Sequence, residues 1–444
     1  MRPREQAETA QSDLFRLKLV NLIDVRHELC RLAERMRWQE LVEGFGALYA
    51  EQGRPGVPIR LMVGLHYLKH AYGLSDEVIV RSWVENPYWQ YFCGEEYFQH
   101  QLPIDPSQMT RFRTRLGAQG CEQLLKLTIA TGLETNAVKP ASFTQVTVDT
   151  TVQEKAIAFP TDARLYHKGR VWLVRLAKRS GIELRQSYLR KGKQALFMQQ
   201  RYAAARQPKR ARRELKRSRV YLGRVYQDIL RKLPAQSAAV QEHFTEPLAL
   251  VARLLAQQRH DKNKLYSLHA PEVECIAKGK AHKKYEFGIK VSLAATQRGN
   301  FIVGALSLPG NPYDGHTLPA ALRQVEPLTG TKPERCFVDR GYRGHGIEGT
   351  QVYIAGQKRG ITPALRRALK RRNAIEPIIG HTKHDGLMGR NYLKGAAGDA
   401  MNAILAAAGH NLRIILRKLR LSWLHFWYPL LRNLRLTVPA IAAA

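Results

Sequence analysis

The 444-residue sequence predicts an α/β protein: a mixed sheet flanked by helices, with a helical domain before it and a long basic helical insertion after its first strand. Three observations predict this. Residues 1–138 read as helical, and short segments rich in β-branched residues then alternate with helical segments. Between the first two of these segments, residues 161–235 hold 22 Lys and Arg against 4 Asp and Glu.

The N-terminal region predicts two helices joined by a short link. Pro58 suits the first turn of a helix that ends at Gly73, and Ser75 caps a second helix that ends before Pro87. This pairing fits either a helix-turn-helix or an ordinary helical hairpin, and spacing alone favours the hairpin.

A third helix is expected after Ser107. It carries Arg111, Arg113 and Arg115, which either contact DNA phosphate or form a solvated basic face. We take these three arginines as candidate DNA-binding residues.

The sheet is predicted from five segments. Strand signals occur at residues 143–151, 285–293 and 301–308, with a turn at 298–300 that predicts a β-hairpin. A helix after Thr317 and strands at 335–339 and 352–355 follow. The predicted domains are a helical domain over 1–138, the sheet domain over 139–155 and 266–410, the insertion over 156–265, and a C-terminal helical tail over 411–444.

Within the insertion, apolar residues recur at steps of seven and of three or four: Leu215, Leu222, Tyr226, Ile229 and Leu233. This spacing predicts a packed helical arm with basic outer faces. A second helix over residues 238–258 is expected to return the chain.

The charge balance predicts a polyanionic partner. The chain has 71 Lys and Arg against 37 Asp and Glu, a formal net charge of +34. Such a surplus destabilises the compact state by self-repulsion unless a polyanion neutralises it, so nucleic acid is the first candidate and an anionic membrane surface the second. With 44% hydrophobic residues the chain can bury a core, which excludes wholesale disorder.

Cysteine spacing and hydropathy exclude other classes of protein. The five cysteines lie far apart without a Cys-x-x-Cys pair, which argues against a disulfide framework and a zinc finger. The first residues lack the apolar core of a signal peptide. The most apolar stretch, residues 421–431, is about half the ~20 residues that a membrane span needs.

Two aspartates end predicted strands, Asp149 in VTVDTT and Asp339 in CFVDRGYRG. If the strands are parallel neighbours, both carboxylates point into the crevice at the carboxyl ends of the strands, where α/β folds bind ligands. A lone aspartate at a strand end is more often a turn residue, so this pair needs a third partner.

Candidates for that partner are Arg372, Glu376 and Lys383, whose spacing places them on one helical face. Pro377 would clash with the preceding turn in mid-helix, so the helix is expected to begin at about Ala374 and to leave Arg372 just outside. A helix with ion pairs on its surface is the alternative.

Three converging carboxylates require a cation. Two like charges about 4 Å apart repel by about 4 kcal/mol at an effective dielectric near 20. Hard oxygen ligands without a cysteine point to Mg²⁺ or Mn²⁺. Two such ions can stabilise both the attacking and the leaving oxygen of a phosphodiester displacement, a reaction that fits a basic protein.

Several motifs occur in a fixed order through most of the chain: GRPGVPIRLMVGLHYLKHAYGLSDE, SQMTRFRTRLG, VDTT, GNPYDGHTL, FVDRGYRG and IEPIIGHTKHDGLMGRNYLKG. In this order they resemble the insertion sequence 5 family of DDE transposases. The resemblance implies an RNase H-like catalytic domain whose metal-binding and catalytic triad is Asp149, Asp339 and Glu376. A Tyr-Arg-Glu-Lys signature of the wider group is matched by Arg372, Glu376 and Lys383, whereas Leu369 stands at the tyrosine position.

The resemblance implies a DNA transposase that cuts double-stranded DNA at the terminal inverted repeats of an insertion sequence and joins it to target DNA, with Mg²⁺ or Mn²⁺ as cofactor. Synapsis of two ends suggests a homodimer, and DNA as the partner places the protein in the cytoplasm, at the nucleoid. The alternatives are a non-catalytic sequence-specific DNA-binding protein derived from a transposase, and a metal-dependent nuclease without strand transfer.

Other polar residues near the motifs are weaker candidates. Asp314 and His316 are expected to shape a turn and a helix cap, and the alternative is that they support the site. His381 and His384 are expected on a helix surface, and Asn391 either touches DNA or packs the following helix.

Overall fold

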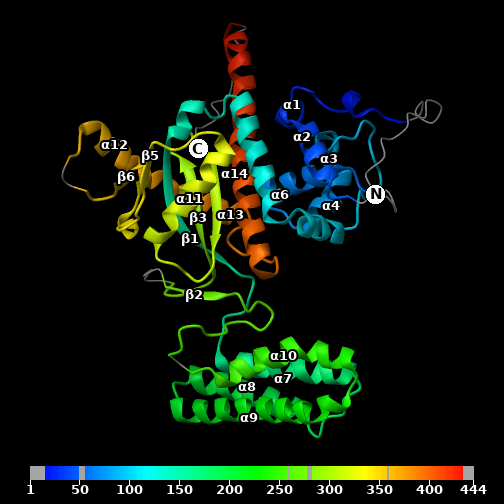
Figure 1. Ribbon diagram of the computed structural model, residues 1–444. Coiled ribbons are helices and arrows are strands. Elements are labelled where there is room, and N and C mark those ends of the chain that lie inside the picture. The colour runs from blue at the N-terminus through cyan, green and yellow to red at the C-terminus, as the bar shows by residue number, and fades with distance from the viewer. Residues whose placement is uncertain (1–15, 50–55, 259, 278–282, 358–359, 434–444) are drawn as a thin grey trace. The chain divides into compact units, whose positions relative to one another are not determined.

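A computed structural model describes residues 16–49, 56–258, 260–277, 283–357 and 360–433, the last twelve of them as backbone only (Figure 1). The described residues form helices and one six-stranded sheet, which confirms the predicted α/β class. The chain divides into two compact units, Met1–Gln153 with Lys290–Ala444, and Glu154–Ile289.

The first unit begins with a run of helices. They are η1 (Leu19–Asn21), α1 (Glu28–Arg35), α2 (Trp38–Gly46), α3 (Ile59–Tyr72), α4 (Asp76–Glu85), α5 (Pro87–Cys93), α6 (Ser107–Glu134) and η2 (Pro140–Thr144).

The predicted ends of α3 and α4 are confirmed. α3 follows Pro58 and ends at Gly73, whose φ of 67° is the left-handed conformation that favours glycine. The Ser75 hydroxyl accepts from the Val78 amide at 3.2 Å and caps α4. After α4, Asn86 caps α5 with Pro87 in its first turn, a helix that the sequence pattern did not predict.

Helix α6 continues past Gly117, which adopts φ 62° and kinks it. Beside α6 runs α14 (Gly395–Asn433), which also packs on α3 and on a strand of the sheet (Figure 1). Gly409 of α14 lies so close to the His70 carbonyl of α3 that a Cβ would not fit. α14 crosses residue 410 without interruption, so the predicted start of the C-terminal tail does not coincide with the start of a helix.

The sheet has the order β2-β3-β1-β5-β6, with β4 also paired to β3. Its strands are β1 (Gln145–Glu154), β2 (Glu274–Ile276), β3 (Glu286–Thr296), β4 (Ile302–Leu308), β5 (Arg335–Val338) and β6 (Gln351–Ile354). β1 and β6 each pair with β5 in parallel, and β3 and β4 form the predicted antiparallel hairpin. Gly299 and Asn300 adopt positive φ in its turn.

The helices that follow the hairpin carry residues of the candidate site. They are α11 (Asp314–Thr329), η4 (Arg340–Tyr342), α12 (Pro363–Arg371), η5 (Arg372–Ala374) and α13 (Ile375–His384). The 3-10 turn of η5 interrupts the helical pattern, and α13 begins at Ile375, so Pro377 falls in the first turn of a helix, as predicted.

The second unit is mainly helical. Its helices are α7 (Asp162–Arg179), α8 (Leu189–Ala204), α9 (Pro208–Lys232), η3 (Leu233–Ala235) and α10 (Ala238–Ala256), and α7–α10 pack side by side (Figure 1). The apolar stripe of α9 faces their common core, where Leu222 and Ile229 are fully buried and Tyr226 is partly buried. Basic side chains of α9, among them Arg213 and Lys216, remain exposed, which is the predicted distribution of apolar and basic faces.

Among the helices of the described residues, none combines the length and apolarity needed to cross a bilayer.

Candidate active site

The parallel pairing of β1 and β5 brings two predicted site residues together. The register runs from Gln145 opposite Arg335 to Thr147 opposite Phe337. Continued by two residues, it places Asp149 opposite Asp339, which directly follows β5. The predicted condition that the two strands are parallel neighbours is therefore confirmed.

Asp149 itself lies inside a strand and not at its end. The sequence predicted a strand over residues 143–151, but β1 extends to Glu154. β1 outlasts β5 because its far end bonds to β3: the Lys155 amide donates to the Phe287 carbonyl at 2.9 Å. Asp149 thus lies just past the point where the parallel partner β5 ends.

The Asp339 carboxylate is oriented by its own turn. Its Oδ1 accepts from the Gly341 amide at 2.9 Å and caps η4. A Cβ at Gly341 would lie 3.1 Å from Asp339 Oδ1 and 3.3 Å from Asp314 Oδ2, so the two carboxylates lie close to the same glycine. Glycine leaves the space that these oxygens occupy.

Asp314 belongs to the site, although the sequence indicated mainly a turn and helix cap. Tyr313 holds the N-cap position of α11, and Asp314 is the first helical residue. Its Oδ1 accepts from Thr150 Oγ1 and from Lys290 Nζ, both at 3.0 Å. No local pattern announces these contacts, because the partners lie on strands far away in the sequence.

A buried hydroxyl lies beside these aspartates. Tyr342 is fully buried, and its hydroxyl has no hydrogen-bond partner among the described residues. Burial raises the pKa of Tyr342 well above its ordinary value, and the negative charges of Asp149, Asp314 and Asp339 raise this pKa further. The three carboxylates therefore act on one point of the interior.

Arg372 connects Asp149 to Glu376. Its Nη1 lies 3.5 Å from Asp149 Oδ2, and its Nη2 lies 3.9 Å from Glu376 Oε1. Arg372 is largely buried, whereas 69% of the Glu376 side chain is exposed. Both separations are longer than a good charge-assisted hydrogen bond, so the arginine neutralises the acids without a tight bidentate grip.

The predicted triad is only partly assembled. Among the described residues, no group of three or more His, Cys, Asp or Glu is arranged to hold a metal ion. Asp149 and Asp339 are neighbours, and Glu376 lies across Arg372. The donor chemistry of these three residues fits Mg²⁺ or Mn²⁺, since every ligand atom that they offer is a carboxylate oxygen.

Lys383 lies in the last turn of α13 and is half-buried. Leu369, at the position of the expected tyrosine, lies half-buried on α12. His381 is exposed and its Nδ1 pairs with Asp385 at 2.8 Å, in agreement with the predicted surface position. Asn391 is buried and donates to Asp399 at 2.6 Å, which supports a packing role and excludes direct contact with DNA.

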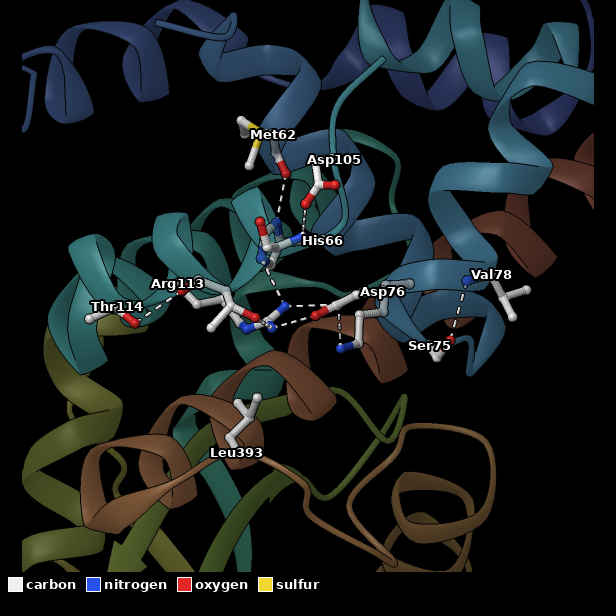
Figure 2. A network of polar contacts seen from close by, with 12 residues as sticks. Met62, His66, Ser75, Asp76, Val78, Asp105, Arg113, Thr114 and Leu393 are labelled. Carbon is white, nitrogen blue, oxygen red and sulfur yellow. Dashed lines mark hydrogen bonds and ion pairs between the residues drawn. The ribbon is translucent and has the colours of Figure 1, made fainter. Parts of the chain in front are cut away.

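The arginines of α6 do not share one environment. Arg111 and Arg115 are exposed, whereas Arg113 is buried. Figure 2 shows its guanidinium directed at Asp76, with Nη1–Oδ1 and Nη2–Oδ2 separations of 2.9 and 2.5 Å. Lys69 Nζ adds a bond to Asp76 at 2.7 Å. The burial of Arg113 contradicts the predicted phosphate contact, because a guanidinium bonded on both sides to a carboxylate does not reach DNA.

The same network bears on the two interpretations of the α3–α4 pair. A recognition helix enters the major groove with its N-terminal residues. The first turn of α4 carries Asp76 and Glu77, and most of α3 is buried. At that end of α4, Asp76 is turned inward to Arg113 and Glu77 is exposed, and both features favour the ordinary helical hairpin.

Two family models match the sequence. Residues 17–115 match a model described as a transposase domain (DUF772), and residues 255–412 match the transposase DDE domain. A protein of Rhizobium meliloti described as an uncharacterized protein, ORF8 in the nfe locus, is 54% identical over 207 residues, which are 47% of this chain and 100% of that protein.

The chain belongs to the DDE transposases of insertion sequences. A comparison with solved structures found no match. In this transposase, Asp339 and Glu376 lie inside the matched DDE domain, and Asp149 lies outside both matched ranges. The link between Asp149 and the other two acids therefore rests on the β1–β5 pairing and on Arg372.

Proposed function

We propose that this transposase cleaves the ends of its insertion sequence in a metal-dependent reaction and transfers the freed strand to target DNA. The observation that carries the proposal is the arrangement at the end of β5, where the β1–β5 register brings Asp149 beside Asp339 and Arg372 lies between Asp149 and Glu376. Family membership supports the same chemistry. We assign the sheet to an RNase H-like catalytic domain over residues 139–155 and 266–410.

Asp149, Asp339 and Glu376 are the proposed catalytic and metal-binding residues, with Mg²⁺ or Mn²⁺ as the ion. Bound there, the cation would activate water and stabilise the leaving oxygen. Arg372, which lies near both Asp149 and Glu376, is proposed to hold a DNA phosphate. Lys383, on the same helix as Glu376, is proposed to position the flanking strand.

DNA binding is also assigned to surfaces away from Asp149, Asp339 and Glu376. The helical domain over residues 1–138 is proposed to bind the terminal inverted repeats, with Arg111 and Arg115 as exposed phosphate contacts. The basic arm, residues 156–265, is proposed as an insertion in the catalytic domain that binds double-stranded DNA, since its exposed arginines and lysines exceed what packing needs. A homodimer at the nucleoid would synapse the two ends.

The function is tested by incubating the purified full chain with Mg²⁺, labelled DNA carrying the element's own end, and a supercoiled target plasmid. Denaturing gels resolve nicks, and native gels resolve joined products. We expect both nicks at the element end and joined DNA. Nicks without joining would identify a nuclease, and retarded DNA without nicks would identify a non-catalytic DNA-binding protein.

The arm is tested by the salt dependence of binding. If it binds about six phosphates, the logarithm of the affinity falls with the logarithm of the salt concentration by a slope near −5. Changing Arg213, Lys216, Arg217 and Arg224 to Gln is expected to flatten the slope by about 0.9 for each phosphate that is no longer neutralised. An unchanged slope in gel-shift titrations would exclude the α9 surface from DNA binding.

A further inference from the structure

One acidic residue near Asp149 and Asp339 is tied to two strands of the sheet. Asp314 Oδ1 accepts from Thr150 Oγ1 on β1 and from Lys290 Nζ on β3, each at 3.0 Å. Thr150 directly follows Asp149 in the sequence. The first bond ties the start of α11 to the segment that carries Asp149, and the second ties it to β3.

The partner of this carboxylate is itself fixed. Lys290 is buried, with 7% of its surface exposed, and its Nζ also donates to the Pro312 carbonyl at 2.7 Å. A buried ammonium is costly unless it is paired and hydrogen-bonded, so Lys290 holds Asp314 in place. The position of Asp314 in the first turn of α11 adds the favourable field of the helix N-terminus.

The other oxygen of Asp314 approaches the second aspartate. Asp314 Oδ2 and Asp339 Oδ1 both lie against the open side of Gly341, at 3.3 and 3.1 Å from where a Cβ would stand. Gly341 in turn holds Asp339 through its amide. Asp314 therefore contacts the neighbour of Asp149 on one side and packs beside the turn of Asp339 on the other.

We propose that Asp314 is a positioning residue of the transposase site, which with Lys290 and Thr150 sets the separation of the Asp149 and Asp339 carboxylates for a shared divalent cation. The inference rests on the proposed function. It differs from a purely electrostatic role, in which Asp314 attracts the cation and Lys290 repels it. It also differs from a packing role that has no influence on the metal.

The direction in which Lys290→Met changes the affinity for the cation separates these roles. Lys290→Met removes a positive charge from the site and releases Asp314. If only the field mattered, the cation would bind more tightly. If Asp314 positions Asp149 and Asp339, the loss of the Lys290–Asp314 bond lets Asp314 move. The cation then binds more weakly, as it does for Asp314→Ala.

The test measures Mn²⁺ affinity of the full chain without DNA, by isothermal titration calorimetry and by the electron paramagnetic resonance signal of free Mn²⁺. Groups that orient metal ligands typically change affinity by about 10–100-fold. We expect Asp314→Ala and Lys290→Met each to weaken Mn²⁺ binding about tenfold, and Thr150→Val to weaken it less. Glu326→Gln, which removes one exposed charge from the other end of α11, is the matched control and is expected to change nothing.

Cleavage of end DNA gives a second measurement. With Asp314→Ala the Mn²⁺ concentration for half-maximal cleavage is expected to rise about tenfold, while the rate at saturating Mn²⁺ largely recovers. A merely structural defect would lower the rate at every concentration. Circular dichroism checks that each variant folds. If Lys290→Met unfolds, Thr150→Val still tests the inference, because it removes only the hydroxyl that bonds Asp314.

Tighter Mn²⁺ binding by Lys290→Met, or unchanged binding by Asp314→Ala, would overturn the inference. Its failure is distinguishable from failure of the proposed function. If the wild-type chain binds Mn²⁺ and Asp149→Asn abolishes that binding, the proposed metal site stands whatever the Asp314 variants do. If the wild-type chain binds no Mn²⁺ and cuts no end DNA, the proposed function fails, and the inference fails with it.

Discussion

The first unit contains two arginine–aspartate groupings that differ in almost every respect. In one, Arg113 grips Asp76 with two bonds of 2.9 and 2.5 Å, and the side chains are 3% and 14% exposed. In the other, Arg372 stands 3.5 Å from Asp149 and 3.9 Å from Glu376, and the glutamate is mostly exposed. The first grouping is tightly bonded. The second is loosely bonded, and we call it open because it ends at the exposed Glu376, although Arg372 and Asp149 are largely buried.

The tight bonding of Asp76 also affects the pKa of its carboxyl group. Burial alone would raise the pKa of the Asp76 carboxyl, but the hydrogen bonds of Arg113 and the charge of Lys69 hold this pKa well below its usual range. Such a pair is stable because both charges are satisfied within the fold. We infer that the loose Arg372 pair can exchange its partner for a cation or a phosphate, as the proposed catalytic role requires.

The largest expected effect comes from the open grouping. Asp149→Asn, Asp339→Asn and Glu376→Gln keep the side-chain shape and remove one anionic ligand each. Each is expected to reduce cleavage and joining at least about a thousandfold, or more than about 4 kcal/mol, because residues that act as a unit fail together. Gel-based cleavage at saturating protein measures the loss.

Binding of end DNA should survive these three substitutions, because affinity rests mainly on Lys and Arg contacts elsewhere. A parallel gel-shift titration is the control. Near-normal cleavage by Glu376→Gln would remove this residue from the triad. Joint loss of binding and cleavage in all three variants would indicate misfolding and contradict the assignment.

The second prediction compares the arginines directly. Arg113→Ala leaves Asp76 buried without its main partner and is expected to lower the free energy of unfolding by roughly 3–5 kcal/mol. Arg372→Ala removes longer and weaker contacts, and is expected to lower the free energy of unfolding by less than Arg113→Ala does, while reducing cleavage. Urea unfolding measures the free energy of unfolding of both variants. Equal losses of stability would abolish the contrast between a structural and a functional pair.

The third prediction concerns acid. Burial, with the nearby Arg113 charge, lowers the pKa of His66 to about 3, and burial lowers the pKa of His410 to about 4, so both are neutral in the folded chain. As pH falls below about 6.5, both histidines become protonated in the unfolded chain but stay neutral in the folded chain. Stability should fall by about 1.4 kcal/mol per pH unit for each histidine, down to about pH 4 for His410 and pH 3 for His66.

Urea unfolding between about pH 7.5 and pH 4.5, followed by the fluorescence of buried Trp83, measures this slope. His66→Gln, which can still bond the Met62 carbonyl, should reduce the slope by one histidine. An unchanged slope in this variant would show that His66 does not cause the loss of stability in acid.

The smallest effect is expected at Lys383. Lys383→Ala should weaken binding of end DNA about three- to tenfold, because one phosphate contact contributes about 1 kcal/mol, and should leave Mn²⁺ affinity nearly unchanged. Gel shift and calorimetry measure the two quantities separately. A loss of Mn²⁺ affinity without a loss of DNA affinity would move Lys383 from the DNA surface to the metal site.

Local signals in the sequence anticipated much of the first unit. The ends of α3 and α4 follow from Gly73, Ser75 and the proline after Asn86, because capping and φ restrictions act within a few residues. The break before α13 follows from Pro377 for the same reason. α5 was missed, since the proline that ended one predicted helix also opens the next.

The candidate site shows where local reasoning stops. The three arginines of α6 look alike in sequence, but Arg113 turns inward to Asp76 and its neighbours turn outward. Asp314 read as a turn residue, and its bonds to Thr150 and Lys290 bridge positions 164 and 24 residues away. Such contacts depend on which strands become neighbours, and no short window contains that information.

The sequence by itself determined the α/β class, the basic character and the transposase family, because composition, periodicity and motif order are properties of the chain alone. Only the tertiary structure decided which charges are tightly paired and which are loosely paired. The physical reason is that the desolvation of a charged group and its pairing depend on distance in space. Parallel strands bring Asp149 and Asp339 together, and the α3–α4–α6 packing closes Asp76 against Arg113.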